Sequence, residues 1–272
     1  MNAINFKRAH KHFGECTEDR IVQSKKPHEN SVSVINKGKI ATINFAFLLL
    51  FPGFFFYQTL LGLGLISAFL GGYFSIISLT IIFPIIFFYY IEIKFVKDYF
   101  SKNDLYFFIF LAYFFLVIII NFSFGANTEI VKTHLLSVIY LINIFIIFKI
   151  IDLNDKILKI ISITSLMIMS VIIFYFSTDG AFNLALLEES KNQVSVATYQ
   201  GFARSYLLTF VLTIIFIRSI TTRVLIYCIA VPALFLNSAR SEFVAMLFLI
   251  PIIEIYYSKN KINLIIIILV IL

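Results

Sequence analysis

The sequence contains no tryptophan, two cysteines, four histidines and few charged residues. Only 14% of its residues are charged while 60% are hydrophobic, which is more apolar than a soluble globular domain. Cys16 lies in a polar segment and Cys228 in an apolar one, so they imply no disulfide framework. His10, His12 and His28 match no metal-ligand spacing. No CxxC, HExxH or glycine-rich phosphate loop occurs either, and we therefore expect neither a metal nor a nucleotide cofactor.

Long uncharged runs determine the expected fold. Residues 40–91 carry no charged side chain, and a membrane-crossing helix needs about 20 apolar residues. Similar runs continue to Leu272. They predict an all-α fold, a polytopic transmembrane helical bundle of about nine spans, at 40–58, 66–91, 105–123, 133–150, 160–177, 202–218, 224–238, 242–257 and from 262 onwards. The ninth span is incomplete at Leu272, and we expect the native protein to continue beyond it.

The basic residues predict the orientation of these spans. A basic tail, residues 1–39, precedes the transmembrane domain, residues 40–272. With the tail in the cytoplasm, strict alternation collects most of the basic residues in the inside segments, as the positive-inside rule requires. Those segments are 1–39, 92–104, 149–159, 218–223 and 258–261. Topology thus accounts for the net charge of +7 without a nucleic-acid partner.

Two arginines stand on the outer side against this bias, at the mouths of spans. Arg204 opens the sixth span and Arg240 lies in the tight turn between the seventh and eighth. An arginine within the membrane costs about 2.5–3.5 kcal/mol unless it has a partner or ligand. Its guanidinium fork suits bidentate capture of phosphate. We therefore predict an outward-facing pyrophosphate site formed by Arg204, Arg240, Gln200, Ser238 and Ser241.

Structural explanations for both arginines stay open. Each side chain can extend to the lipid headgroups, Arg240 can pair with Glu242, and Arg204 can pair with Glu188 or Glu189 in the outer loop. The sequence identifies no catalytic residue. The candidates for a general base are Glu188, Glu189 and His134, which opens the fourth span on the outer side.

Three features resemble the O-antigen polymerase and O-antigen ligase family of bacterial envelope proteins, over about residues 60–272. The first is a many-span, isoleucine- and phenylalanine-rich architecture with a cytoplasmic N-terminus. The second is the Tyr-Gln-Gly-x-x-Arg stretch at 199–204, which opens a span after a periplasmic loop. The third is the Asn-Ser-Ala-Arg-Ser turn at 237–241, in which Ala239 replaces the usual serine or glycine and Glu242 is an unusual successor.

The resemblance implies a multi-pass protein of the bacterial inner membrane. It would transfer glycan units from an undecaprenyl-pyrophosphate carrier on the periplasmic face, without nucleotide or metal, and Arg204 and Arg240 would bind the pyrophosphate. The implied partners are the carrier-linked glycan, membrane lipids and other polysaccharide-assembly proteins. The family's second large periplasmic loop, with its histidine, does not occur before Leu272.

Two other functions remain open. A transporter or flippase of lipid-linked oligosaccharides would place charged residues on broken helices near mid-membrane. Here the main charge within a span is Glu254, near the inner end beside Tyr256 and Tyr257, and no internal repeat is visible. The early end of the chain also fits an inactive, truncated remnant of a polymerase.

Overall fold

The computed structural model describes residues 37–67, 73–92, 102–125, 127–182, 184 and 199–257. Contacts divide the chain into two units, residues 1–42 and 43–272. The first helix, α2, crosses the division, and the other described elements belong to the second unit.

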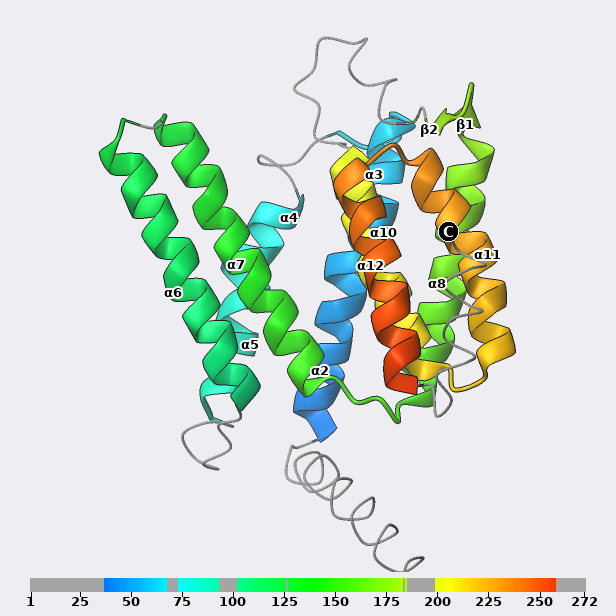
Figure 1. The fold of residues 1–272 in the computed structure, drawn as a ribbon, viewed down its shortest axis with the longest axis horizontal. Coiled ribbons are helices and arrows are strands. Elements are labelled where there is room, and N and C mark those ends of the chain that lie inside the picture. The colour runs from blue at the N-terminus through cyan, green and yellow to red at the C-terminus, as the bar shows by residue number, and fades with distance from the viewer. Residues whose placement is uncertain are drawn as a thin grey trace, which may run out of the picture. The chain divides into compact units, whose positions relative to one another are not determined.

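The second unit consists of helices whose directions alternate along the chain (Figure 1). We call its upper end the one where α3, α6, α8 and α11 end and where α7, α10 and α12 begin. The lower end is the opposite one. The elements are α2 (Lys37–Leu48), η1 (Leu49–Gly53), α3 (Phe54–Gly62), α4 (Tyr73–Ile76), η2 (Ile77–Ile82), α5 (Phe83–Ile91), α6 (Lys102–Ser123), α7 (Thr128–Ile150), α8 (Lys156–Tyr175), β1 (Ser177–Thr178), β2 (Ala181–Phe182), α10 (Tyr199–Phe216), α11 (Ile220–Leu236) and α12 (Arg240–Tyr257).

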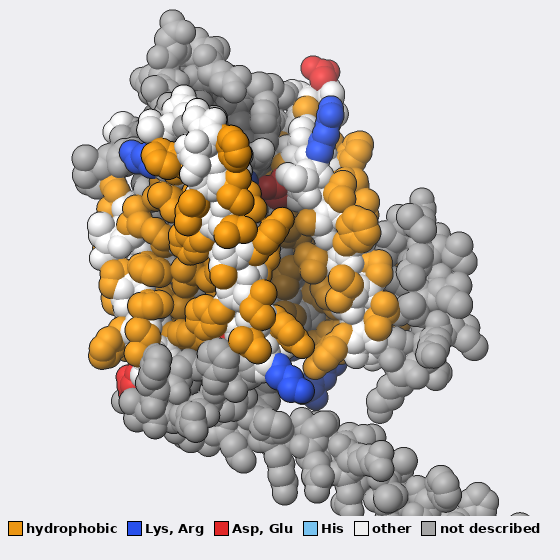
Figure 2. All heavy atoms as spheres, turned by 60° about the vertical axis from the view of Figure 1, so that its left-hand side comes forward, with side chains coloured by type: hydrophobic (Ala, Val, Ile, Leu, Met, Phe, Trp, Pro, Cys, Tyr) orange, Lys and Arg blue, Asp and Glu red, His pale blue; other side chains and the backbone are white. Residues whose placement is uncertain are grey.

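Four helices are long and apolar enough to cross a membrane: Gly38–Gly62, Phe74–Ile91, Lys102–Ser123 and Lys156–Tyr175. Hydrophobic side chains cover the middle of the face in Figure 2, with charged side chains above and below them. Nine crossings were expected, but several of the other helices are shorter. The 17 residues of α11 extend only about 26 Å, less than the roughly 30 Å of a bilayer core. The span from 262 lies outside the described residues.

Two stretches of π-helix interrupt the first two membrane-length helices. η1 contains Pro52, and η2 ends just before α5, where Pro84 stands in the first turn. Proline has no N–H to donate and its ring clashes with the carbonyl four residues earlier, so a wider π-turn accommodates it within a continuing helix. Both helices therefore pass their prolines without ending.

The main core lies among α8, α10, α11, α12 and α3. α10 is central, since its Phe202, Tyr206 and Phe210 are all fully buried. The Tyr206 hydroxyl lies 2.7 Å from that of Ser170 on α8, which satisfies two polar groups inside the core. Burial of these large aromatic side chains fixes α10 against its neighbours.

A short hairpin, β1–β2, departs from the expected all-α fold. Ser177 pairs with Phe182 around a turn in which Asp179 and Gly180 both have positive φ, the arrangement that a two-residue hairpin turn favours. Phe182 is fully buried, and its ring meets that of Phe202 edge to face at 5.0 Å. The hairpin thereby anchors the start of the outer loop to α10.

A buried ion pair joins α11 to α12 near the lower end. The Nε and Nη2 atoms of Arg223 donate to the two carboxylate oxygens of Glu254, at 2.6 and 2.7 Å. Tyr227 donates to the same carboxylate at 2.6 Å. Nη1 of Arg223 donates to the carbonyls of Ile217 and Arg218. The span predicted from 224 therefore begins too late, since Arg223 belongs to α11 and is 3% exposed.

The same chemistry recurs among α5, α6 and α7. Asp104 of α6 is fully buried, Lys149 of α7 lies 3.1 Å from its carboxylate, and the Tyr90 hydroxyl donates to it at 3.1 Å. This cluster and the one around Glu254 each join a carboxylate, a cation and a tyrosine from neighbouring helices. Because a buried charge without its partner is costly, these contacts fix the helices at one register.

Removal of the Glu254 carboxylate tests the contribution of its ion pair. Glu254→Ala is expected to lower the free energy of unfolding by about 3–5 kcal/mol, because it leaves the Arg223 guanidinium buried without a counter-charge. Thermal unfolding of the purified protein in detergent, followed by helical circular dichroism, measures the loss. Tyr256→Ala is the matched control, since that side chain is 84% exposed on the same helical turn. Equal stability of the two variants would contradict the prediction.

Candidate functional site

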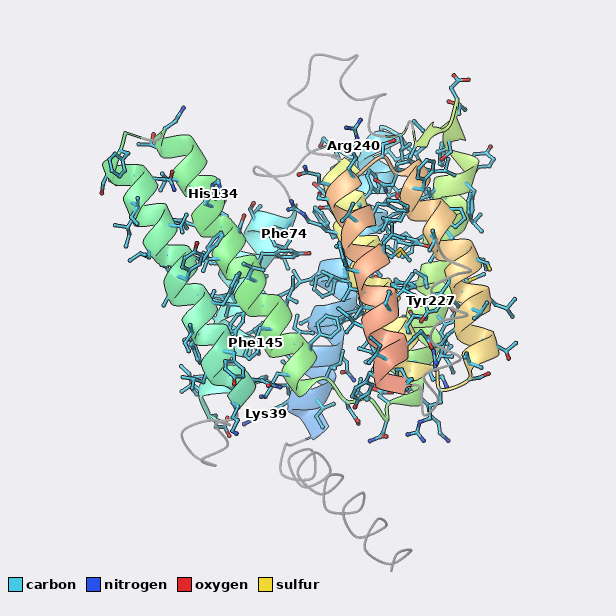
Figure 3. The ribbon with its side chains drawn as sticks, in the orientation of Figure 1. Lys39, Phe74, His134, Phe145, Tyr227 and Arg240 are labelled. Carbon is cyan, nitrogen blue, oxygen red and sulfur yellow. The ribbon has the colours of Figure 1, made fainter. Side chains whose placement is uncertain are left out.

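A cavity of about 230 Å³ lies in the upper half of the second unit, among η1, α3, α4, η2, α7 and α10. Phe74, one of its lining residues, is labelled on α4 in Figure 3. Both π-helical segments contribute to the lining, through Leu50 and through Ser78 and Leu79. π-turns of this kind occur frequently at functional sites.

The lining combines a polar and an apolar set of side chains. The polar set offers hydroxyls, amides and one guanidinium, from Gln58, Ser75, Ser78, Ser137, Tyr140, Gln200, Arg204 and Ser205. The apolar set is Leu50, Phe54, Phe74, Leu79, Leu136 and Ile139. Phe74 meets Phe54 and Tyr140 edge to face, with ring centroids 5.7 and 4.9 Å apart. Such a cavity suits a ligand that has a polar head and an apolar body.

Arg204, on the first turns of α10, is the one cationic residue that lines this cavity among the described residues. Its Nε donates to Oε1 of Glu242 on α12 at 3.1 Å, and its Nη2 donates to Oε1 of Gln200 at 3.4 Å. Ser241 donates to the second oxygen of Glu242 at 2.6 Å. The side chain of Arg204 is 50% exposed and that of Glu242 only 8%.

Arg204 and Arg223 each pair with a glutamate of α12, but they differ in how many of their N–H groups already donate hydrogen bonds. Arg223 has partners on Nε, Nη1 and Nη2. Arg204 uses one N–H on Nε and one on Nη2, which leaves three of its five donors without a partner in the described part of the chain. Arg223 therefore uses four of its five donors and is 3% exposed. Arg204 uses two, is half exposed, and can still bind an acceptor.

Gly201 permits a close approach of Gln58 to α10. A Cβ at this position would lie 2.7 Å from Oε1 of Gln58 and closer still to its Nε2. Alanine normally favours a helix over glycine by about 1 kcal/mol, but here it would force the Gln58 amide to move. The pairing of glycine on α10 with an amide on α3 shapes this wall of the cavity.

The predicted pyrophosphate residues fall into two groups. Gln200, Arg204 and Ser241 come together around Glu242. Arg240 and Ser238 are exposed in and beside the turn between α11 and α12, where Ser238 has a φ of 61°. Figure 3 shows Arg240 at the upper end of α12. Of the pairings left open by the sequence, Glu242 is bonded to Arg204 rather than to Arg240.

The candidate bases lie elsewhere. His134 is exposed on α7 and its ring stacks with Phe114 of α6, at a centroid distance of 6.5 Å. It does not line the cavity. Glu188 and Glu189 lie outside the described residues. Within the described ranges no group of three or more His, Cys, Asp or Glu side chains could hold a metal ion.

Sequence reasoning missed most of the cavity wall. Gln58, Ser78 and Tyr140 were overlooked because each stands singly among apolar residues, without a motif. Gln58 carries the clearest signal, since it is one of the two amide side chains, with Asn44, in the uncharged run 40–91. An amide there needs a hydrogen-bond partner or a ligand, because the hydrocarbon core supplies none.

Comparison of the chain with protein-family models, with curated proteins and with solved structures finds no match.

Access of water to the cavity can be tested on two adjacent residues of α7. In a variant whose Cys16 and Cys228 are replaced by serine, Ser137→Cys is expected to react with a water-soluble maleimide, because Ser137 lines the cavity. Val138→Cys is the control, since Val138 is 2% exposed and packs against α6. The extent of labelling is measured by mass spectrometry on membrane vesicles. Equal labelling of the two positions would contradict a water-accessible cavity.

Proposed function

We propose that the chain is a membrane glycan polymerase or ligase, which transfers O-antigen or related polysaccharide units from an undecaprenyl-pyrophosphate carrier. The observation that carries the proposal is Arg204, a half-exposed guanidinium with unused donors at a cavity whose other described lining residues are uncharged. A diphosphate is the ligand class for which such a fork is suited. The apolar part of the lining is compatible with the polyprenyl chain that carries it.

The proposed reaction is a displacement at the anomeric carbon of the carrier-linked sugar. A hydroxyl of the acceptor glycan forms the new bond, the bond to the diphosphate breaks, and the diphosphate leaves with its lipid. Negative charge grows on the leaving oxygen, so donors of Arg204 aimed at it would lower the barrier. Arg240, exposed at the same end, is proposed as a second ligand of this diphosphate.

The proposed location is the bacterial inner membrane, with the upper end facing the periplasm and the N-terminus in the cytoplasm. The alternation of helix directions and the distribution of basic residues support this orientation. α7, α10, α11, α12 and the segment from 262 would then complete the nine proposed spans. Helices as short as α11 could cross by local thinning of the bilayer.

A transporter of the same lipid-linked glycan would need a similar cavity. An assay of glycan transfer by the purified protein distinguishes the two functions. A polymerase or ligase joins glycan to an acceptor in a nanodisc that has no second compartment. A transporter moves the lipid between leaflets and makes no new glycosidic bond. Failure to form glycan product with intact lipid movement would favour the transporter.

Replacement of Arg204 tests the proposed chemistry. Arg204→Ala is expected to reduce glycan transfer by about 100-fold, the typical cost of losing one donor to developing negative charge. Arg204→Lys should retain part of the rate, since it keeps the charge but loses the fork. Arg240→Ala should reduce transfer as well. The measurements are glycan banding on gels from cells and transfer by the purified protein in nanodiscs.

The matched control is Lys132→Ala, which removes an exposed cation from the upper end of α7, away from the cavity lining. It should leave banding unchanged. Normal banding in Arg204→Ala, with insertion of the protein verified, would refute the proposal.

A further inference from the structure

Glu242 occupies an unusual position for a carboxylate near a proposed anion site. It lies in the first turn of α12, is nearly buried, and contacts Arg204 directly. A negative charge beside a phosphate-binding arginine would be expected to weaken phosphate binding by repulsion. Its burial and its two hydrogen bonds therefore require another explanation.

The hydrogen bonds of the Arg204 guanidinium explain why a carboxylate can lie beside the proposed anion site. Glu242 and Gln200 engage Nε and Nη2, which leaves the Nη1 group without a partner within the described residues. Arg204 and Gln200 line the cavity, and Glu242 is absent from the described residues that line it. The carboxylate thus holds Nε. Both N–H groups of Nη1 and the second N–H of Nη2 stay available for a bidentate ligand.

Glu242 is itself firmly held. Ser241 donates to its Oε2 at 2.6 Å, and the N-terminus of α12 favours a negative charge in its first turn. A fixed carboxylate reduces the rotamer freedom that Arg204 would otherwise lose when a ligand binds. It also keeps the empty site close to neutral, which lowers the cost of holding an arginine at a membrane-embedded cavity.

We propose that Glu242 is the positioning residue of the site: it holds Arg204 by its Nε atom so that the Nη1–Nη2 edge faces the diphosphate of the lipid-linked donor. The identity of this anion rests on the proposed function. Glu242 acts through Arg204 and does not touch the substrate.

Two substitutions separate positioning from simple electrostatics. Glu242→Gln and Glu242→Ala remove the same charge, but glutamine keeps an oxygen that accepts from Nε. If Glu242 acted only through its charge, both variants would bind an anion more tightly. Positioning predicts that Glu242→Gln binds at least as tightly as the unchanged protein, and that Glu242→Ala binds on the order of tenfold more weakly. Ser241→Ala, a milder change, should weaken binding less than Glu242→Ala.

The dissociation constant of undecaprenyl pyrophosphate is measured on the full chain in nanodiscs, with thermal unfolding as the check on folding. Affinity that decreases in the order Glu242→Gln, Ser241→Ala, Glu242→Ala supports positioning. Equal affinities of the glutamine and alanine variants overturn it, as does unchanged affinity in Arg204→Ala. Should Glu242→Ala not fold, Ser241→Ala with affinity equal to that of the unchanged protein overturns it.

Parallel assays of glycan transfer distinguish this inference from the proposed function. Suppose that neither the unchanged protein nor any variant transfers glycan, but the affinities for undecaprenyl pyrophosphate follow the expected order. The proposed function is then wrong and the positioning role of Glu242 stands. If transfer depends on Arg204 while the two Glu242 variants behave alike, the function stands and the positioning role is wrong.

Discussion

The cost of placing charge inside an apolar helical bundle constrains the whole structure. The charged residues that are buried in the described part of the chain, Asp104, Arg223, Glu242 and Glu254, all lie in ion pairs. Each pair joins two different helices, and two of them add a tyrosine hydroxyl. Because an unpaired charge in such surroundings costs several kcal/mol, the pairing restricts how α6 can sit against α7 and α12 against α10 and α11.

Glu242 and Glu254 of α12 each pair with an arginine, but they leave different numbers of its N–H donors unused. Near the lower end Glu254 accepts from Nε and Nη2 of Arg223, and backbone carbonyls accept from Nη1, so four of the five donors of this buried arginine are used within the protein. At the upper end Glu242 accepts only from Nε of Arg204, whose side chain is half exposed at a cavity lined by both polar and apolar side chains. Arg223 and Arg204 thus differ in how many of their donors the protein already uses, and this difference is the basis for proposing Arg204 as a ligand-binding residue.

The sequence predicted much of the fold and part of the site. Apolar runs located most helices from α2 to α12 to within five residues at each end, since exclusion of charge from the bilayer is a strong local signal. The exception is the span predicted at 66–91, since residues 66 and 67 are not helical and α4 begins at Tyr73. Burial of Arg223 could not be predicted, because its partner Glu254 lies 31 residues away and Arg223 looks like a loop residue before an apolar run. The bond from Arg204 to Glu242 spans 38 residues. The cavity wall comes from four separated segments, and only packing brings Gln58, Ser137 and Gln200 together.

Arg204 is proposed to present its terminal nitrogens to a lipid-linked diphosphate while Glu242 holds its Nε atom. An electron cryo-microscopy structure of the full chain in nanodiscs with undecaprenyl pyrophosphate tests this most directly. We expect a phosphate within hydrogen-bonding distance of Nη1 and Nη2 of Arg204, with the bond from Nε to Glu242 retained. A diphosphate bound away from Arg204, or a Glu242 carboxylate displaced from Nε by the phosphate, would contradict it.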